Sequence, residues 1–432
     1  MTSSEQTELR ANARRAVEDG RLDVAEAAFL ALLKQIPDDL ESLNFVAMLA
    51  MSRQQLPMAR ELLERARDAA PNDGTTGKNL GVVLLHAGEH ETAEHLLLDT
   101  LSGDPDFFVA RLYLGLALER QNRVREASVH YFKAIGTAQG QGFWTSPRTT
   151  PPGLRASVEH AIRFTRTIRR QLLGAVLAPM HTRFGREAMK RVDRCLAAYL
   201  GEINCPPPDA RQKPGFMYFP DLPTEPFLPR QAFPWYEALE AKTPALREEL
   251  VGLLGARPQL EPFLGEPPPG MRSSYLGGGD DTATPRWDGF FFYRHGRRYD
   301  ENCRRSPKTV AALESTSMVH IRDHAPEALF SVLGPGSHIL PHHGVTNTRV
   351  VTHLPLIVPG QCTLRVADQR HDWQEGCCVT FDDTFEHEAW NNSERTRVIL
   401  LFDVWNPHLT EVERIAVTEL VAAIGDLSAD KL

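Results

Sequence analysis

Cysteine is scarce in this sequence and shows no spacing typical of a zinc site or a disulfide framework. Only six cysteines occur in 432 residues. No apolar run approaches the roughly 18 residues that cross a bilayer. The first twenty residues lack the apolar core of a signal peptide. These absences predict a protein of a reducing compartment, the cytoplasm, without a membrane span.

An excess of positive charge is missing as well. The formal net charge is −8 at pH 7, which argues against a nucleic-acid partner because phosphate binding needs a basic surface. Apolar residues make up 42% and charged residues 24%, as in ordinary globular proteins. The length predicts two or three domains and sets no oligomeric state.

The first third of the chain contains a repeat of 34 residues. Three prolines, four alanines and two glycines keep this spacing: Pro37, Pro71, Pro105; Ala25, Ala59, Ala93, Ala127; Gly81, Gly115. Each unit has two apolar runs at helical spacing, and small residues let two antiparallel helices approach closely. The pattern resembles the tetratricopeptide repeat, with about four units in residues 1–139. Such an array is expected to bind a protein or peptide segment.

The middle of the chain separates this array from a second domain. Residues 140–205 are predicted to be a linker and a helical bridge. Nine prolines in residues 205–234 exclude regular structure there and favour an extended arm over the following domain. Residues 234–254 are predicted to form one amphipathic helix.

From about residue 287 the pattern changes to short apolar runs separated by turns. Examples are DGFFFYRHG, RVVTHLPLIVPG and RVILLFDVW. Runs of this kind are typical of a β-sandwich or jelly roll. We therefore expect a multidomain protein, an all-α repeat superhelix followed by a double-stranded β-helix (jelly-roll, cupin-like) domain with flanking helices.

Two histidines in this region are candidate metal ligands. His342 lies in PHHG, and His387 follows 45 residues later, with Arg397 ten residues beyond it. Iron sites in jelly rolls use two histidines and one carboxylate, with the acid two residues after the first histidine. That position is Gly344, so the residues alone leave either a two-histidine site or two hydrogen-bonded histidines with no metal.

The acids near His387 do not obviously complete a triad. Glu386 and Glu388 flank it on a strand and would point to the opposite face. Asp382 and Asp383 precede a turn, where acids more often cap or stabilise the turn.

Longer motifs resemble the aspartyl/asparaginyl β-hydroxylase family. They include GPGSHILPHHGVTNTRVVTHLPLIVPGQCTLRV, FDDTFEHEAWN and VILLFDVWNPHLT, and the resemblance covers about residues 215–415. The expected domain spans residues 206–420. Some members of the family also carry N-terminal tetratricopeptide repeats.

The resemblance implies an Fe(II)- and 2-oxoglutarate-dependent oxygenase that consumes O2. His342 and His387 would hold the iron, and Gly344 would stand where related enzymes carry an acid. Arg397 and Ser331 would hold the distal carboxylate of 2-oxoglutarate, and His353 would approach its other end.

The resemblance also assigns Arg349 to a carboxylate of the substrate. Two departures from the family bear on the substrate class and on the compartment. Val351 stands where members commonly have arginine, so a free Asp or Asn side chain is not assured as the substrate. Cys303 matches a cysteine that is disulfide-bonded in secretory relatives, but Val310 occupies its partner's place, which agrees with a reducing compartment.

The predicted function is hydroxylation of a C–H bond, by resemblance the β-carbon of an Asp- or Asn-type residue in a protein or peptide, with release of succinate and CO2. Two alternatives stay open. One is a non-catalytic repeat adaptor with a degenerate oxygenase domain, which Val351 favours. The other is a hydroxylase of a small-molecule or lipid acyl substrate.

Overall fold

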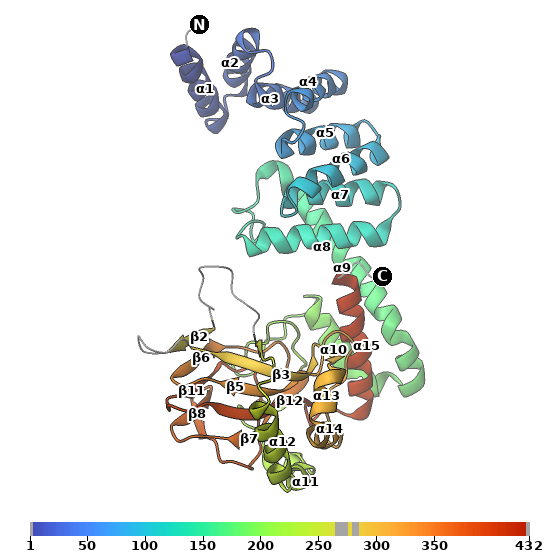
Figure 1. Ribbon diagram of the computed structural model, residues 1–432. Helices are drawn as coiled ribbons and strands as arrows, with labels where there is room; N and C mark the ends of the chain where they lie inside the picture. Colours follow the sequence, from blue (N-terminus) through green and yellow to red (C-terminus); the bar gives the residue numbers. More distant parts are fainter. Residues whose placement is uncertain (1–2, 264–274, 279–284, 429–432) are drawn as a thin grey trace. The chain divides into compact units, whose positions relative to one another are not determined.

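The computed structural model describes residues 3–263, 275–278 and 285–428, and the chain divides into two compact units (Figure 1). The first unit is Met1–Leu172 and the second is Leu173–Leu432. The division at residues 139 and 205 that the sequence suggests stays a prediction. Within the described residues, no helix combines the length and apolar character needed to cross a bilayer.

The first unit is an array of helix pairs, which confirms the repeat prediction. Its helices are α1 (Ser3–Glu18), α2 (Leu22–Gln35), α3 (Leu40–Ser52), α4 (Leu56–Ala69), α5 (Gly74–His86), α6 (His90–Gly103), α7 (Phe108–Arg120) and α8 (Val124–Gly140). The repeated prolines lie two residues beyond α2, α4 and α6, where they end the second helix of each pair. Asp39 and Asp73 cap α3 and α5 by accepting hydrogen bonds from backbone N–H groups.

The repeated glycines allow close packing within a pair. A Cβ atom on Gly115 would lie 2.6 Å from the Tyr131 ring, and one on Gly81 would lie 2.8 Å from Leu97. Both partners are fully buried. The period seen in the sequence is therefore a period of helix–helix contacts.

The second unit contains two antiparallel sheets that face each other. The seven-stranded sheet has the order β1 (Glu261–Pro262), β3 (Trp287–Arg294), β5 (Ala328–Leu333), β12 (Arg397–Trp405), β7 (Arg349–Ile357) and β10 (Val379–Phe381), with β4 (Arg297–Arg298) paired to β3. The five-stranded sheet has the order β2 (Leu276–Gly278), β6 (Ser337–His342), β11 (His387–Asn391), β8 (Cys362–Val366) and β9 (Gln369–Asp372). Leu333 and Val351 from one sheet share a buried cluster with Leu364 and Ala389 from the other.

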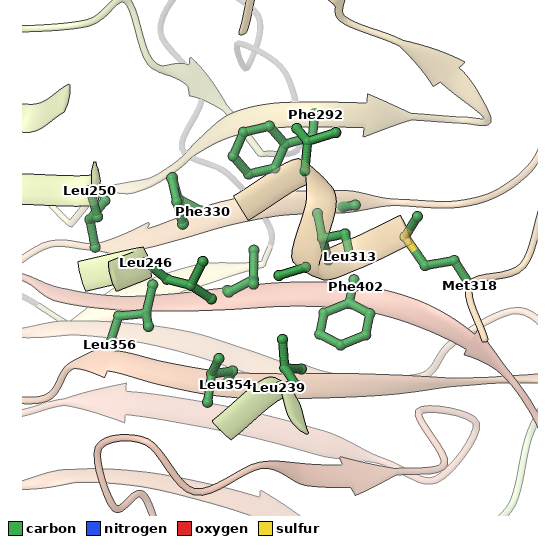
Figure 2. Packing of buried hydrophobic residues seen from close by; sticks show 14 of the residues in the cluster. Leu239, Leu246, Leu250, Phe292, Leu313, Met318, Phe330, Leu354, Leu356 and Phe402 are labelled. Atoms are coloured by element: carbon green, nitrogen blue, oxygen red, sulfur yellow. The ribbon is translucent and has the colours of Figure 1, made fainter. Parts of the chain in front are cut away.

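Helices cover the outer face of the seven-stranded sheet. They are α11 (Tyr236–Glu240), α12 (Thr243–Gly255), α13 (Asp300–Arg305) and α14 (Pro307–Glu314). Figure 2 shows Leu246 and Leu250 of α12 beside Leu356 of β7, and Leu313 of α14 above Phe402 of β12. Because side chains alternate along a strand, the other face of β7 and β12 points toward the five-stranded sheet.

The segment predicted as one helix at residues 234–254 is two helices, so that prediction was wrong in its boundaries. The chain turns between Glu240 and Thr243, and Pro244 lies in the first turn of α12. Proline is favoured at a helix start because it has no N–H to donate and its φ is already helical.

The remaining helices of the second unit pack together beside the sheets. α10 (Arg186–Tyr199), α15 (Glu411–Ser428) and the part of α9 (Arg155–Phe184) that follows Leu172 share one buried cluster. Arg191 of α10 pairs with Glu413 of α15 at 2.6 Å.

The proline-rich segment between α10 and α11 is an extended arm, as predicted. Its only regular element is a short 3-10 turn at Arg230–Ala232. The backbone N–H of Gly215 donates to the carbonyl of Gly344 at 3.0 Å, and that of Lys213 donates to Thr384 at 2.8 Å. The arm thereby holds the two turns that follow β6 and β10.

Candidate active site

A cavity of about 740 Å³ lies between the two sheets. All six residues selected from the sequence line it: His342, His387, Ser331, His353, Arg397 and Arg349. They come from five different strands, β6, β11, β5, β7 and β12. The fold therefore gathers these residues around one space.

His342 and His387 form a pair on neighbouring strands. They are direct partners in the β6–β11 ladder, and their ring centroids are 4.0 Å apart. Nδ1 of His342 donates to the carbonyl of Leu340 at 2.8 Å, and Nδ1 of His387 donates to the carbonyl of Phe385 at 3.0 Å. These bonds place the proton on Nδ1 and leave the Nε2 lone pair of each ring available.

Both rings are neutral at physiological pH. Burial lowers the pKa of His342, and burial together with the neighbouring His342 lowers the pKa of His387 to about 3. A metal takes the neutral imidazole, so the protonation state suits a ligand pair. In the part of the chain that the structure describes, no cluster of three or more His, Cys, Asp or Glu side chains has metal-binding geometry.

Asp383 is a cavity residue that the sequence reasoning treated as a turn residue. Asp382 does stabilise the turn, because its Oδ1 accepts from the N–H of Thr384 at 2.9 Å. Asp383 instead turns its buried carboxylate into the cavity, where a side chain at Gly344 would overlap it. Burial raises the pKa of Asp383 to about 7, and the nearby Arg349 opposes that rise. The sequence signal was a second acid, Asp383, behind the turn acid that follows the buried run VTF.

Arg397 places a positive charge at one end of the cavity. It is 1% exposed, and its Nε and Nη2 atoms have no hydrogen-bond partner among the described residues. Its guanidinium lies 4.8 Å from the centre of the Trp373 ring. Burial lowers its pKa to about 10, so it stays charged at neutral pH. A buried cation with unsatisfied donors is suited to bind an anion.

Ser331 and His353 lie beside this cation. The Oγ atom of Ser331 accepts from Nε1 of Trp287 at 3.0 Å, which leaves the hydroxyl hydrogen free to donate to a ligand. His353 is 5% exposed, and burial and Arg397 hold its pKa well below the usual value. His343 follows β6 in the turn and also lines the cavity.

Arg349 is already engaged by carboxylates of the protein. Its Nη1 atom lies 2.6 Å from Oδ1 of Asp403 and 3.8 Å from Oδ2 of Asp383. Asp403 also accepts from the backbone N–H of Glu327 at 2.9 Å. Asp403 was not predicted as a site residue, although its position in β12, six residues after Arg397, puts it on the same face.

Two family models match parts of this chain. A family model described as aspartyl/asparaginyl β-hydroxylase matches residues 240–407, which include both sheets and all six residues selected from the sequence. The C-terminal domain is similar to the aspartyl/asparaginyl β-hydroxylase family. A tetratricopeptide-repeat model matches residues 10–74 and 78–140. Both resemblances inferred from sequence motifs are confirmed.

The relatives that match this domain carry several names. The human aspartyl/asparaginyl β-hydroxylase is 27% identical over 89% of this chain and 46% of its own length. The human aspartate β-hydroxylase domain-containing protein 1 is 32% identical over 54% of this chain and 58% of its own length. An ornithine lipid ester-linked acyl 2-hydroxylase of Rhizobium tropici is 33% identical over 43% of this chain and 62% of its own length.

Each of these matches spans less than two thirds of the relative's own length. Among solved structures, MamA protein aligns with 48% of this chain and 100% of its own, with 17% identity and a TM-score of 0.32.

Proposed function

We propose that the β-hydroxylase domain is an Fe(II)- and 2-oxoglutarate-dependent dioxygenase that hydroxylates a C–H bond of a protein or peptide side chain, of the Asp or Asn type by its family. The observation that carries this proposal is the pairing, in one cavity, of two neutral histidines with free Nε2 atoms and a buried arginine with unsatisfied donors. A divalent metal fits the two histidines, and one carboxylate of a dicarboxylate fits the arginine.

His342 and His387 would hold the iron, with 2-oxoglutarate and O2 as cosubstrates. When bound, the iron would couple oxidation of the substrate to oxidative decarboxylation of 2-oxoglutarate. In sum, R–H, O2 and 2-oxoglutarate give R–OH, succinate and CO2. Arg397 binds the distal carboxylate of 2-oxoglutarate, and Ser331 donates its hydroxyl hydrogen to the same group. His353 lies toward the other end of the cosubstrate.

The rest of the cavity positions the substrate and keeps out water. Ile399, Leu401 and Leu364 supply an apolar surface between the two ends of the cavity. Asp383 supplies a carboxyl group beside Gly344, where a side chain on the turn after β6 would overlap it. The tetratricopeptide repeats would bring a protein or peptide segment to the chain.

A second candidate is hydroxylation of an acyl chain. The apolar middle of the cavity favours it, and the Rhizobium relative is named for an acyl 2-hydroxylase activity. A non-catalytic adaptor is the third. The intact set of buried polar side chains argues against it, because unused buried polar groups cost stability.

The test is anaerobic reconstitution with Fe(II) and 2-oxoglutarate, followed by O2 and measurement of succinate. We expect O2-dependent succinate from the wild type and none above background from His387→Ala or His342→Ala. If all three proteins form the same background amount of succinate with peptide and acyl substrates, the non-catalytic adaptor is the remaining candidate. Hydroxylated product from one substrate class decides between the first two candidates.

A further inference from the structure

Arg349 is held on one side of its guanidinium group and open on the other. Its Nη1 atom donates to Oδ1 of Asp403 at 2.6 Å. Asp383 lies 3.8 Å from the same Nη1 atom, which is too far for a hydrogen bond. Within the described residues, Nε and Nη2 of Arg349 make no hydrogen bond, and the side chain lines the cavity with 16% of its surface exposed. The edge formed by Nε and Nη2 is therefore available to a ligand.

Asp403 is fixed in place by bonds that do not involve Arg349. It is 1% exposed, and its Oδ2 atom accepts from the backbone N–H of Glu327 at 2.9 Å. Its own N–H donates to the carbonyl of Glu327 at 3.0 Å, and its carbonyl accepts from the N–H of Val319 at 3.2 Å. The carboxylate of Asp403 is thus a rigid support for the long and flexible Arg349 side chain. Such a support orients the guanidinium before any ligand arrives.

The register of β7 and β12 makes this ion pair specific. Asp403 is the ladder partner of Val351, and Arg349 is the ladder partner of Trp405, so the pair runs diagonally between the two strands. Because Val351 is apolar, the residue directly opposite Asp403 does not compete for its carboxylate. Among the described residues, Arg349 is the one arginine or lysine that forms an ion pair with Asp403.

The other arginines that line the cavity are differently engaged. Arg294 donates from Nη1 to Glu261 at 3.0 Å and from Nη2 to the carbonyl of Phe263 at 3.0 Å, so it keeps no complete edge for a carboxylate. Arg397 lies six residues before Asp403 on β12, or about 20 Å away along the strand. The edge of Arg349 is therefore separate from the cation that is proposed to bind 2-oxoglutarate.

We propose that Asp403 is a positioning residue for substrate binding: it holds Nη1 of Arg349 so that the Nε–Nη2 edge receives the side-chain carboxylate, or the carboxamide oxygen, of the reacting residue. This edge matches a carboxylate through two parallel hydrogen bonds, and its prior orientation lowers the entropic cost of binding. Asp403 itself does not contact the substrate. The inference rests on the proposed dioxygenase function and names the residue on which recognition of an Asp- or Asn-type side chain depends.

The test compares ligands of similar shape that differ in one polar group. The N-acetyl methylamides of aspartate, asparagine and leucine are titrated calorimetrically into the full-length protein loaded with Mn(II) and 2-oxoglutarate under nitrogen. We expect the wild type to bind the aspartate compound at least about tenfold more tightly than the leucine compound, with the asparagine compound between them. The ratio of the aspartate and leucine affinities is called the carboxylate preference.

Three substitutions separate the charge of the pair from its geometry. Asp403→Asn removes the support, Arg349→Met removes the guanidinium, and Arg349→Lys keeps a cation beside Asp403 but has no second edge. Each is expected to lower the carboxylate preference to about threefold or less. Because Asp403 acts through Arg349, adding Asp403→Asn to Arg349→Met should cause no further loss, and a merely structural role would not produce that coupling. The affinity for 2-oxoglutarate, measured in each variant, should stay within about twofold of the wild type.

Two control variants remove other carboxylates. Glu261→Gln weakens the hold on Arg294, which lines the same cavity, and Glu394→Gln removes a carboxylate from an exposed loop. Both should leave the carboxylate preference unchanged. An equal loss in Glu261→Gln would show that the preference follows the total charge around the cavity and not the orientation of Arg349.

The remaining outcomes separate this inference from the function beneath it. Equal affinity for the aspartate and leucine compounds in the wild type, or no binding of either at millimolar concentration, would overturn the role of the Arg349 edge. An unchanged preference in Asp403→Asn, or additive losses in the double variant, would overturn the positioning role of Asp403. Succinate formation is measured separately with the same compounds. A carboxylate preference that depends on Asp403, in a protein that never forms succinate, would refute the dioxygenase and keep the carboxylate site.

Discussion

The carboxylate of Asp383 occupies the space that a side chain at Gly344 would fill. The backbone also joins these two residues, because the N–H of Gly344 donates to the carbonyl of Asp383 at 2.6 Å. The acid that is missing after His342 is thus replaced, in position, by an acid that the chain supplies from the turn before His387. Glycine at position 344 is therefore required by packing against Asp383. Its presence means more than that a metal-binding acid is missing there.

A carboxylate restored at position 344 should therefore destabilise the protein. Gly344→Asp forces two carboxylates into one buried space, and we expect the free energy of unfolding to fall by about 2–3 kcal/mol. Adding Asp383→Ala should recover most of that loss, so the two changes will be strongly coupled. Thermal unfolding measures both. Gly360→Asp, at an exposed glycine with open space around it, is the control and should change little.

Arg397 is expected to support cosubstrate binding at the expense of stability. Arg397→Met removes a buried charge whose Nε and Nη2 atoms have no hydrogen-bond partner in the described part of the chain. We expect 2-oxoglutarate affinity to fall by about 100-fold or more, while the ligand-free protein gains about 1–3 kcal/mol. Calorimetric titration with Mn(II) present and thermal unfolding without ligand give the two quantities.

The control for this charge lies two residues earlier, in the turn before β12. Arg395 is exposed, and Arg395→Met should alter neither quantity. Unchanged 2-oxoglutarate affinity in Arg397→Met would show that the cation serves another anion or none.

Glu327 should make stability depend on pH in a defined window. Its pKa is raised from 4.5 to about 7 in the folded protein, so the folded state retains a proton that the unfolded state has lost. The free energy of unfolding therefore falls as pH rises from about 4.5 to 7, by up to about 3 kcal/mol from this group. Glu327→Gln resembles the protonated acid. It should match the wild type near pH 4.5 and exceed its stability by a growing margin up to pH 7.

Urea denaturation at pH 5 and pH 8 measures that margin, with Glu394→Gln as the control. A margin of equal size at both pH values would mean that the substitution acts through packing and that Glu327 is not titrating in this range.

Contacts between residues that lie far apart in the chain could not be predicted from the sequence. The repeats were predictable because each contact recurs every 34 residues, and the histidine pair was predictable because each partner lies in a distinctive motif. Asp383 and Gly344 are 39 residues apart. They come together through the pairing of β6 with β11 and through the hydrogen bonds that the proline-rich arm makes to both turns. Arg349 and Asp403 meet through the register of β7 and β12, which no local pattern specifies.

The repeat array allows a last prediction with an internal control on the same pair of helices. A Cβ on Gly115 would lie 2.6 and 2.7 Å from Tyr131 ring carbons, and the Tyr131 hydroxyl is held by Glu119 at 2.7 Å. The ring cannot shift without losing that bond, so we expect Gly115→Ala to cost about 1–3 kcal/mol.

Gly136 in α8 is exposed and has no atom within 4 Å of an added Cβ. Gly136→Ala should therefore gain up to about 1 kcal/mol, because alanine favours the helix. Hydrogen exchange of the amides in α7 and α8, measured in the full-length chain, reports both changes within the first unit. Protection that rises in both variants would mean that the helices can separate to admit a methyl group, and that close approach at Gly115 is not what the repeated glycine provides.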